Sequence, residues 1–380
     1  MSNAVEQEEI QFEEDDFELL NEEGRIFDQP FEGKPIGFLK DAFIRLCKNK
    51  VSVAAFLAIV FIAIFAIVGP GLTPYGYNEQ NPNILNMPPR IPILENFGIA
   101  DGSRVINSIQ KANLEDTERF PEGCILRIVN EFEIRGVEMV DVEVDYYKYT
   151  GYDDAYFPFG TDYLGRDLWT RLWRGARISL FIAVTSVLTN VVIGIVYGSI
   201  AGYYGGKVDI VMMRITEVLD AFPQVIMATM LILFLGAGIE AIVLSLILRG
   251  WIGTARVIRD QFLRFKEREY VLAAKVMGVR DRMLIFRHIL PNSIGPVITR
   301  AMLAIPSAIF AESFLAFIGL GVQAPEPSIG VLLSDGQKVL NLYPNQTFFP
   351  ALLISVLMIA FNLFGNGLRD AFNPTLRGSE

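Results

Sequence analysis

Long apolar stretches separated by charged segments dominate the pattern along this chain. Four stretches contain no Asp, Glu, Lys or Arg: residues 51–78, 178–206, 221–239 and 339–368. Two further apolar stretches, at about 238–258 and 293–319, carry isolated charges. A helix of about 20 residues crosses a bilayer core about 30 Å thick, because each residue advances it by about 1.5 Å. The pattern therefore predicts an all-α polytopic membrane protein with six spans.

The segment between the first two spans follows a different pattern. Apolar residues recur at roughly alternate positions on both sides of Arg135-Gly136: Ile125, Ile128, Phe132 and Ile134 before it, and Val137, Met139, Val142, Val144 and Tyr146 after it. Alternation of this kind is typical of strands, and the glycine favours a hairpin. Unstructured loops longer than about 15 residues are uncommon. We therefore expect a small β-containing insertion here, with a plain connecting loop as the alternative.

Charge is distributed unevenly along the chain, whose net charge is −10. Residues 1–24 hold ten acidic residues and no Lys or Arg, and residues 71–170 hold 17 acidic and 8 basic residues. The polar, acidic tail over 1–35 has a composition typical of disorder. No basic face of the kind that binds nucleic acid is present, so we expect no nucleic-acid partner.

The basic residues predict the orientation in the membrane. They cluster beside alternate ends of the spans: at Lys40–Lys50, at Lys207 and Arg214, at nine positions between Arg256 and Arg287, and at Arg369 and Arg377. Short loops rich in Lys and Arg stay in the cytosol. Both termini are therefore expected in the cytosol, and the segment 72–176 outside it.

Span two carries Gly194, Gly198 and Gly202 at intervals of four residues. Glycines at this spacing lie on one helix face and let another backbone approach closely. We expect a close helix–helix contact there, with a partner that the pattern does not identify.

The basic loop over 256–291 predicts a compact pair of short helices. Ala273, Ala274, Val276 and Met277 favour a helix, which Gly278 is expected to end as its C′ residue. A second helix is expected from Asp281, acting as N-cap, to Leu290, with Pro291 ending it. Small and apolar residues on such a helix suit insertion into a groove on another protein.

This loop resembles the "EAA" loop of importer-type ABC permeases, whose pattern is Glu-Ala-Ala, three residues, Gly, nine residues and Ile-x-Leu-Pro. Ala273, Ala274, Gly278, Leu290 and Pro291 match that spacing, whereas Leu272 replaces the Glu and His288 the Ile. Glu269 lies one helical turn earlier. The resemblance implies an ATPase-coupling loop made of these residues: Glu269, Leu272, Ala273, Ala274, Met277, Gly278, Arg282, Leu290 and Pro291.

Other segments resemble the second ("C") permease of the dipeptide/oligopeptide importers. They are Phe159-Gly-Thr-Asp-Tyr-Leu-Gly-Arg-Asp167, Gly175-Ala-Arg-Ile-Ser179, Ala201-Gly-Tyr-Tyr-Gly-Gly206, Phe317-Ile-Gly-Leu-Gly-Val322 and Phe361-Asn-Leu-Phe-Gly-Asn-Gly-Leu-Arg-Asp370. The resemblance implies the type I ABC importer permease fold in a bacterial cell membrane, surrounded by lipid. The implied partners are a homologous second permease, two cytosolic ATPase subunits, an extracytoplasmic peptide-binding protein and an oligopeptide substrate.

The pattern and the resemblance together divide the chain into five parts. They are an acidic cytosolic tail (1–50), the first span (51–71), the extracytoplasmic segment (72–176), a permease domain of five helices with the coupling loop (177–370), and a cytosolic C-terminal tail (371–380).

The chain lacks the residues that catalysis would need. No G-x-x-x-x-G-K-[ST] phosphate loop is present, so ATP and Mg are expected in the partner ATPases. With one histidine and no Cys/His cluster, neither a metal site nor a cofactor is expected. We therefore predict a non-catalytic subunit.

Three charged residues lie in or near apolar spans: Arg249, Arg300 and Glu312. A charge at mid-bilayer costs about 2.5–3.5 kcal/mol on insertion scales, so each should face protein, water or an interface. They are candidates for a polar lining of the pathway; internal ion pairing or snorkelling is the equally weighted alternative. Pro223, Pro296 and Pro306 are expected to kink spans three and five.

Two alternatives to a peptide permease remain open at this point. Relatives that carry nickel or another small solute share the same motifs. An ATP-independent channel or secondary transporter is the alternative from a different class, and it would leave the loop at 269–291 unexplained.

Overall fold

The computed structural model describes residues 38–117 and 119–372. The chain divides into two units, Met1–Asp41 and Ala42–Glu380. Of the first unit only residues 38–41 are described, as the start of helix α1 (Phe38–Lys48), a helix that the sequence pattern did not predict. The predicted disordered tail over 1–35 and residues 373–380 of the predicted C-terminal tail lie outside the described residues.

Five helices in the described part of the chain are long and apolar enough to cross a membrane. They are α2 (Lys50–Val68), α4 (Leu168–Tyr204), α7 (Ile239–Phe265), α10 (Leu290–Phe317) and α12 (Asn345–Ala371). All five helices share one buried apolar core, to which they contribute, in chain order, Ile62, Ile182, Ile242, Ile309 and Leu357. Helices α2, α4 and α12 overlap charge-free windows, whereas α7 and α10 overlap the two predicted stretches that carry isolated charges.

The third span differs from the prediction. Instead of one helix over 221–239, helices α5 (Gly206–Ala221) and α6 (Gln224–Leu235) meet at a bend of 80°. Pro223 explains the break, because proline forces the preceding residue out of the helical region, and Phe222 is extended with φ −79° and ψ 131°. Lys207 and Arg214, expected in a loop, therefore lie on α5. The six predicted spans become five continuous helices and one bent pair.

Helix α4 begins nine residues before the predicted boundary at 177. Asp167 caps it, because its carboxylate accepts hydrogen bonds from the backbone N–H groups of Trp169 and Thr170. Its 37 residues make it roughly 55 Å long, more than the thickness of a bilayer core. The inserted segment consequently ends near Asp167.

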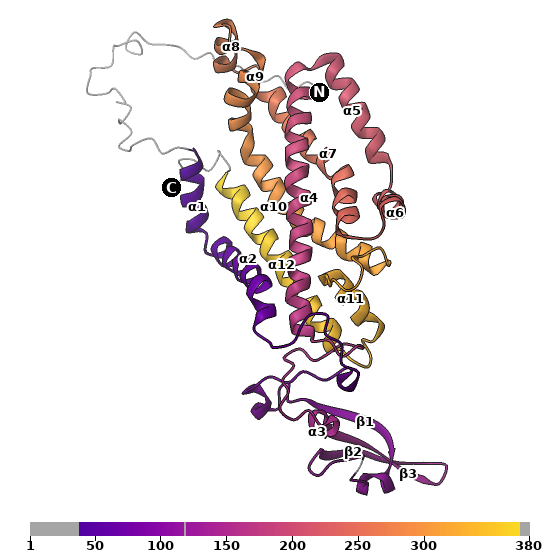
Figure 1. Cartoon of the computed structure of the whole chain (residues 1–380). Helices are drawn as coiled ribbons and strands as arrows, with labels where there is room; N and C mark the ends of the chain where they lie inside the picture. The colour runs from indigo at the N-terminus through magenta and orange to yellow at the C-terminus, as the bar shows by residue number, and fades with distance from the viewer. Residues whose placement is uncertain (1–37, 118, 373–380) are drawn as a thin grey trace, which may run out of the picture. The chain divides into compact units, whose positions relative to one another are not determined.

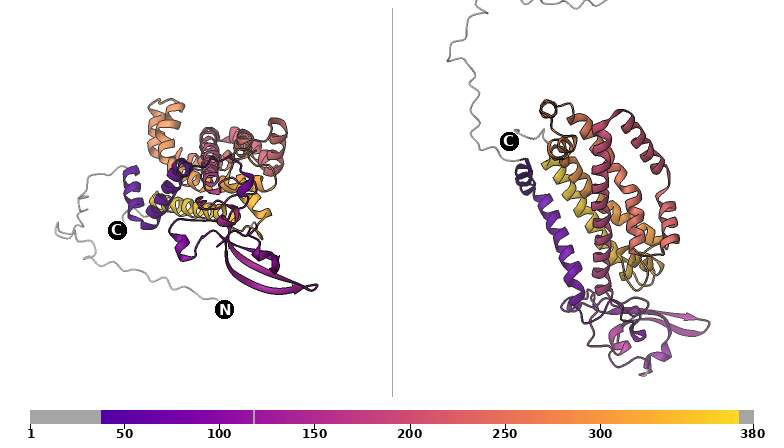
Figure 2. Two further views of the ribbon diagram at one scale, coloured as in Figure 1. Left: turned by 60° about the horizontal axis from the view of Figure 1, so that its bottom comes forward. Right: turned by 45° about the horizontal axis from the view of Figure 1, so that its top comes forward.

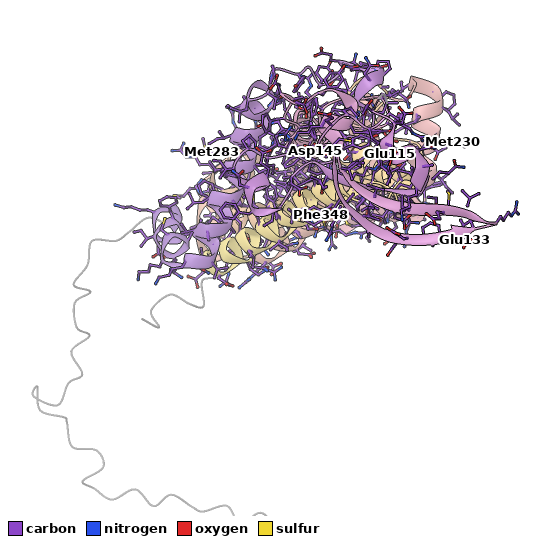
Figure 3. All side chains as sticks on the ribbon, turned by 90° about the horizontal axis from the view of Figure 1, so that it is seen from below. Glu115, Glu133, Asp145, Met230, Met283 and Phe348 are labelled. Atoms are coloured by element: carbon purple, nitrogen blue, oxygen red, sulfur yellow. The ribbon has the colours of Figure 1, made fainter. Side chains whose placement is uncertain are left out.

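The insertion contains a three-stranded antiparallel sheet, as expected in outline. Strands β1 (Ser103–Gln110), β2 (Ile125–Ile134) and β3 (Val137–Asp145) pair in the order β1-β3-β2. The hairpin at Arg135-Gly136 is confirmed, with positive φ at both residues (52° and 80°). Figure 3 shows Glu133 near the far end of this hairpin. Strand β1 was not predicted.

Contacts fix the insertion to the start of α12, so it is an ordered part of the second unit. The Asn345 side-chain amide donates to the Phe159 carbonyl at 2.9 Å, and the Gln346 amide donates to Asn86 Oδ1 at 2.8 Å. The Arg104 guanidinium lies 4.4 Å from the centre of the Tyr343 ring. Short helices complete this region and its neighbours: η3 (Gly69–Gly71), η4 (Pro82–Ile84), η5 (Leu94–Phe97), η6 (Lys111–Glu115), α3 (Tyr146–Thr150) and α11 (Ile329–Lys338).

The glycine face of α4 packs against α7, which identifies the neighbour that the sequence left open. A Cβ atom on Gly198 would lie 2.3 Å from the Ala255 carbonyl oxygen, and one on Gly202 would lie 2.6 Å from Phe262 Cβ. A Cβ on Gly194 would lie 2.6 Å from Thr254 Cβ. Both helices therefore approach closely only because these positions lack a side chain.

Candidate functional site

The loop with the EAA-like pattern lies at the end of the helices opposite the sheet (Figures 1 and 2). Its first helix, α8 (Glu269–Val276), forms as predicted. Gly278 follows with φ +81°, the left-handed conformation expected of a C′ glycine. A Cβ atom there would meet nothing within 4 Å, so the backbone conformation rather than crowding favours glycine.

The second helix of the loop differs from the prediction at both ends. Helix α9 (Asp281–Met283) has Arg280, not Asp281, at its N-cap position, and no side chain caps it. Pro291 does not end a helix, because a π-helical segment, η7 (Leu284–Ile289), leads directly into α10. The Leu290 N–H bonds the Ile285 carbonyl five residues back, and proline is tolerated in a first helical turn, where its missing N–H is not needed. The helical path therefore runs unbroken over Asp281–Phe317.

The two alanines of the loop have different environments. Ala274 is 3% exposed and packs with Val271 in a buried apolar cluster that also contains Ile258, Phe262 and Leu284. Ala273 is exposed. It shares the surface with apolar side chains of the same helix and its end: Tyr270, Leu272, Val276 and Met277, of which the last two are 89% and 77% exposed. We call these five residues the apolar face of α8.

Two hydrogen bonds tie the loop to the helices beneath it. The Tyr203 hydroxyl, at the end of α4, donates to Asp281 Oδ1 at 2.6 Å. The Asn292 amide donates to the Tyr270 hydroxyl at 3.2 Å. The sequence analysis named Asp281 only as an expected N-cap and predicted neither hydrogen bond. Of the other predicted loop residues, Glu269, Arg282 and Pro291 are exposed and Leu290 is half-buried.

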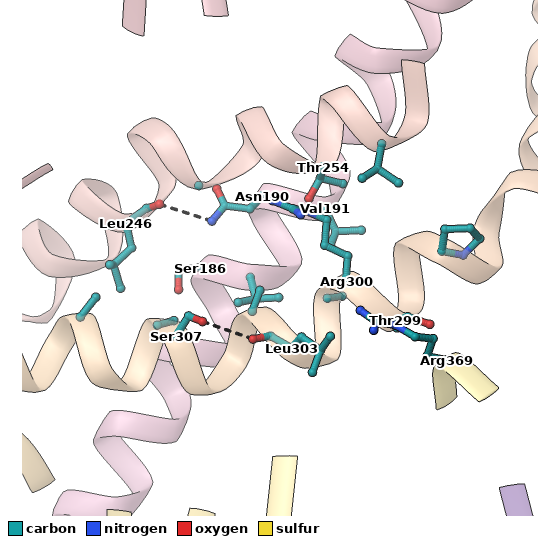
Figure 4. Close-up of a pocket in the computed structure, with 18 of the residues that line it drawn as sticks. Ser186, Asn190, Val191, Leu246, Thr254, Thr299, Arg300, Leu303, Ser307 and Arg369 are labelled. Carbon is teal, nitrogen blue, oxygen red and sulfur yellow. Dashed lines mark hydrogen bonds between the residues drawn. The ribbon is translucent and has the colours of Figure 1, made fainter. Parts of the chain in front are cut away.

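A cavity of about 700 Å³ lies among α4, α7, α10 and α12 (Figure 4). Six of its polar lining residues belong to the first three of these helices, and Gln224 of α6 is a further one. The six are Ser186, Asn190, Thr254, Thr299, Arg300 and Ser307. Arg369 of α12 lines it as well. Apolar residues such as Val187 and Leu246 make up the rest, so the cavity combines an apolar wall with a few hydrogen-bonding groups.

Of the three charged candidates, only Arg300 lines this larger cavity. Its guanidinium lies against Gly253 of α7, where a Cβ atom would be 1.8 Å from Nη2. Arg249 instead forms an ion pair with Asp220 at 2.7 Å, and Arg256 shares the same carboxylate at 3.1 Å. Arg249 thus has the internal partner that the ion-pair interpretation requires.

Glu312 lies apart from the cavity, fully buried where α10 meets α4 and α11. The Ser179 hydroxyl donates to Glu312 Oε2 at 3.0 Å, and it also accepts from the Ile329 N–H at 3.1 Å. These two bonds connect α10, α4 and α11 through the Ser179 hydroxyl. The arrangement gives Glu312 a role in packing rather than a place on the cavity wall.

A polar cluster joins the segment after α10 to α4 near the sheet end. Arg174 pairs with Glu326, with nitrogen–oxygen distances of 2.9 and 3.0 Å, and the Tyr77 hydroxyl donates to Glu326 at 3.2 Å. The Arg174 guanidinium holds the pKa of the Glu326 carboxyl below its ordinary value. In the nearby Phe159–Asp167 segment, Asp162 pairs with Arg166 at 2.7 Å, and both side chains are buried.

Comparison with known proteins places this architecture in a family. A family described as "Binding-protein-dependent transport system inner membrane component" matches residues 194–378, and the "N-terminal TM domain of oligopeptide transport permease C" matches residues 37–89. The dipeptide transport system permease protein DppC of Bacillus subtilis is 35% identical over 364 residues, which cover 96% of this chain and 94% of that protein. This chain is a member of the permease C family.

Further permease C proteins match over more than half of this chain. The oligopeptide transport system permease protein OppC of Escherichia coli is 34% identical over 92% of this chain and 95% of its own length. OppC of Bacillus subtilis is 46% identical over 58% of this chain and 72% of its own length. Among solved structures, a chain from inward-facing MetNI methionine ABC transporter has a TM-score of 0.46 and 17% identity, covering 53% of this chain and 96% of its own.

Membership establishes the general character of this permease C protein. It is a multi-pass inner-membrane permease subunit of an ABC importer, mostly helical, with a small sheet insertion. The apolar face of α8 and the polar cavity are the two features from which a more specific function can be argued.

Proposed function

We propose that this chain forms half of the translocation pathway of an ATP-driven oligopeptide importer. A homologous permease supplies the other half, two cytosolic ATPase subunits drive the cycle, and an extracytoplasmic binding protein delivers the peptide. ATP and Mg are held by the ATPases, and this chain is a non-catalytic subunit without a cofactor of its own. Both of its termini lie in the cytosol. The peptide transport systems named for its relatives support the choice of cargo.

The apolar face of α8 is the observation that carries the proposal. Leu272, Val276 and Met277 are all about half or more exposed on a short helix at the end of the molecule. Water-exposed apolar side chains grouped on one helix suit a groove on a partner protein. Because Tyr203 and the buried cluster below hold the loop in place, movement of a docked ATPase is passed to α4 and α10. An ATP-independent channel would leave this face without a partner.

The charge of the cavity favours a peptide over a nickel ion. Arg300 and Arg369 line the cavity, and no Asp or Glu is among its lining residues. Two cationic side chains repel a divalent cation but not a zwitterionic peptide. We therefore favour peptide import over the nickel alternative within the family.

The test replaces one exposed alanine and compares it with another. In the reconstituted complex of both permeases, the ATPases and the binding protein, Ala273→Arg places a long charged side chain on the apolar face of α8. Peptide uptake and stimulated ATP hydrolysis should fall about tenfold or more, since one poorly accommodated interface charge costs about 2 kcal/mol or more. Ala112→Arg, at an exposed position of η6, makes the same change at the sheet end and serves as the control.

Two readouts make the outcome decisive. Both variants should assemble, because Ala273 is exposed and its replacement creates no buried clash. Co-purification of the two permeases checks this. Equal uptake and ATPase activity in the two variants would contradict the proposed coupling. If the unmodified complex takes up radioactive Ni²⁺ but not labelled tetra-alanine, the peptide assignment is contradicted.

A further inference from the structure

The cavity region carries more positive charge than its carboxylates neutralise. The charged residues that line a smaller recess of about 400 Å³ are Asp220, Arg249, Arg256 and Arg300. The recess shares Gln224, Gly250 and Arg300 with the larger cavity. Asp220 is the one carboxylate among its lining residues, and both Arg249 and Arg256 already bind it. Within residues 38–117 and 119–372, the ion pairs leave Arg300 without a carboxylate. The recess therefore has three guanidinium groups for one carboxylate.

Helix α7 is shaped to accommodate two polar side chains of the cavity. Gly253 leaves the space that the Arg300 guanidinium occupies, since a Cβ atom there would overlap it at 1.8 Å. Gly250, one helical turn earlier, does the same for Asn190, whose Nδ2 would lie 2.1 Å from an added Cβ. Both glycines weaken the helix by about 1 kcal/mol relative to alanine. The space they leave positions a guanidinium and an amide on the same cavity wall.

Asn190 supplies an acceptor to complement the donors of Arg300. Its side chain is only 9% exposed, and its Nδ2 donates to the Leu246 carbonyl at 3.3 Å (Figure 4). Its Oδ1 is buried and has no hydrogen-bond partner in the described part of the chain. A buried acceptor without a donor costs about 1–3 kcal/mol, which a ligand N–H can recover.

We propose that Arg300 binds the C-terminal carboxylate of a transported peptide, while Asn190 Oδ1 accepts a main-chain N–H of the same peptide. This inference rests on peptide import as the function of the chain. A planar guanidinium forms two parallel hydrogen bonds with a carboxylate, and the exposed side chain of Arg300 is accessible to one. Both groups recognise features common to every linear peptide, so the cavity orients the cargo without selecting its side chains.

The experiment compares tetra-alanine with its C-terminal amide in the reconstituted complex. Affinity of the binding protein for each probe is measured separately, and uptake is compared at saturation of the binding protein. The unmodified complex should transport the free acid about tenfold faster than the amide, because a hydrogen bond to a charged group contributes at least about that factor. Arg300→Gln should lower uptake of the acid to the level of the amide and leave uptake of the amide unchanged. Arg300→Lys should restore part of the difference.

A second variant moves the guanidinium without removing its charge. Gly253→Ala places a methyl group where Nη2 lies, and the flexible arginine, rather than the backbone, gives way. Because alanine also favours the helix, this variant should fold at least as well as the unmodified chain and still lose the preference for the acid. Arg214→Gln, which removes an exposed arginine of α5 paired with Glu217, is the control that should keep the preference.

The possible failures are distinguishable. Equal transport of acid and amide by the unmodified complex would overturn the inference and leave peptide import intact. A parallel loss of both probes in Arg300→Gln would also overturn it, because that result indicates an ion pair with the second permease. Absence of uptake of either probe by the unmodified complex would refute peptide import itself, and this inference with it.

Discussion

Replacing Gly198 by alanine tests the close contact between α4 and α7. The added Cβ would lie 2.3 Å from the Ala255 carbonyl oxygen and 2.9 Å from Ile258 Cβ. Carbon–oxygen contacts of this kind ordinarily measure about 3.3 Å or more, so the helices must separate by about 1 Å. The obstructing oxygen belongs to the backbone and cannot rotate away. The substitution should therefore disturb the whole interface rather than one side chain.

The expected magnitude follows from two opposing terms. Overpacking a well-packed contact costs about 1–3 kcal/mol, and a backbone obstruction places Gly198→Ala at the upper end. A gap of about 1 Å elsewhere along the pair forfeits a quarter to a half of the dispersion energy of the affected contacts, which adds to this cost. Alanine recovers about 1 kcal/mol through its helix propensity. The net loss should be about 2 kcal/mol.

The assay is the melting temperature of the purified complex, followed by size-exclusion chromatography after heating. Gly295→Ala, in α10, is the matched control, because its Cβ would meet Phe372 at an ordinary 3.4 Å. That variant should be as stable as the unmodified chain or more so. The reasoning is refuted if Gly198→Ala melts no earlier than Gly295→Ala.

Two further predictions concern the ends of the helices. Tyr203→Phe removes the 2.6 Å hydrogen bond to Asp281, which stabilises the loop by about 1 kcal/mol. Fewer peptides should then be transported per ATP hydrolysed than in the control variant Tyr204→Phe. An equal number of peptides per ATP in the two variants would count against this prediction. Because Arg174 lowers the pKa of Glu326, their pair stabilises the folded chain above the ordinary glutamate pKa of 4.5 and loses this effect as the pH falls through the lowered value. Acidification below about pH 4.5 should therefore lower the melting temperature of the unmodified complex more than that of Glu326→Gln, because the pair contributes at most about 1 kcal/mol to the free energy of unfolding. Parallel curves of melting temperature against pH would disprove the assignment.

The charge-free windows predicted the helices well because lipid tolerates little else, but charges hid the first turns of α4. Arg171, Arg174 and Arg177 made residues 168–177 look like a loop. In the structure Arg171 lies 3.4 Å from Asp162, Arg174 binds Glu326, and Arg177 donates to the Ala66 carbonyl. Arg171 also donates to the Tyr77 carbonyl at 3.1 Å, so each of the three has a partner distant in sequence, which a local window does not detect.

The sequence predicted β2 and β3 but not β1, although the pairing of β2 with β3 also shifts register, between Ile125 and Arg127 and between Ile128 and Asn130. Strand β3 alternates strictly from Val140 onward, and its inward residues Val140, Val142 and Val144 are fully buried. Strand β1 breaks the pattern, because its pairing with β3 shifts register between Ile106 and Ile109. An irregular strand of this kind is defined by its partner rather than by its own sequence.

The candidate site was predictable in its motif and not in its geometry. The EAA-like spacing located the loop, but only packing separates buried Ala274 from exposed Ala273. The placement of Arg300 on Gly253 depends on how α10 is aligned with α7, and no pattern within either helix encodes that alignment. Pairs between distant helices lie beyond what periodicity can specify.

The unbroken helical path over Asp281–Phe317 has a consequence for the kind of change that the chain tolerates. Each helical residue turns the path by about 100°, so the direction in which Arg300 points is set by the number of residues that separate it from the loop. A point substitution between them alters one side chain, whereas a single-residue insertion or deletion swings the guanidinium off the cavity wall without changing hydropathy. Among functional descendants of this sequence, the number of residues between Pro291 and Arg300 should therefore vary far less than the identity of those residues.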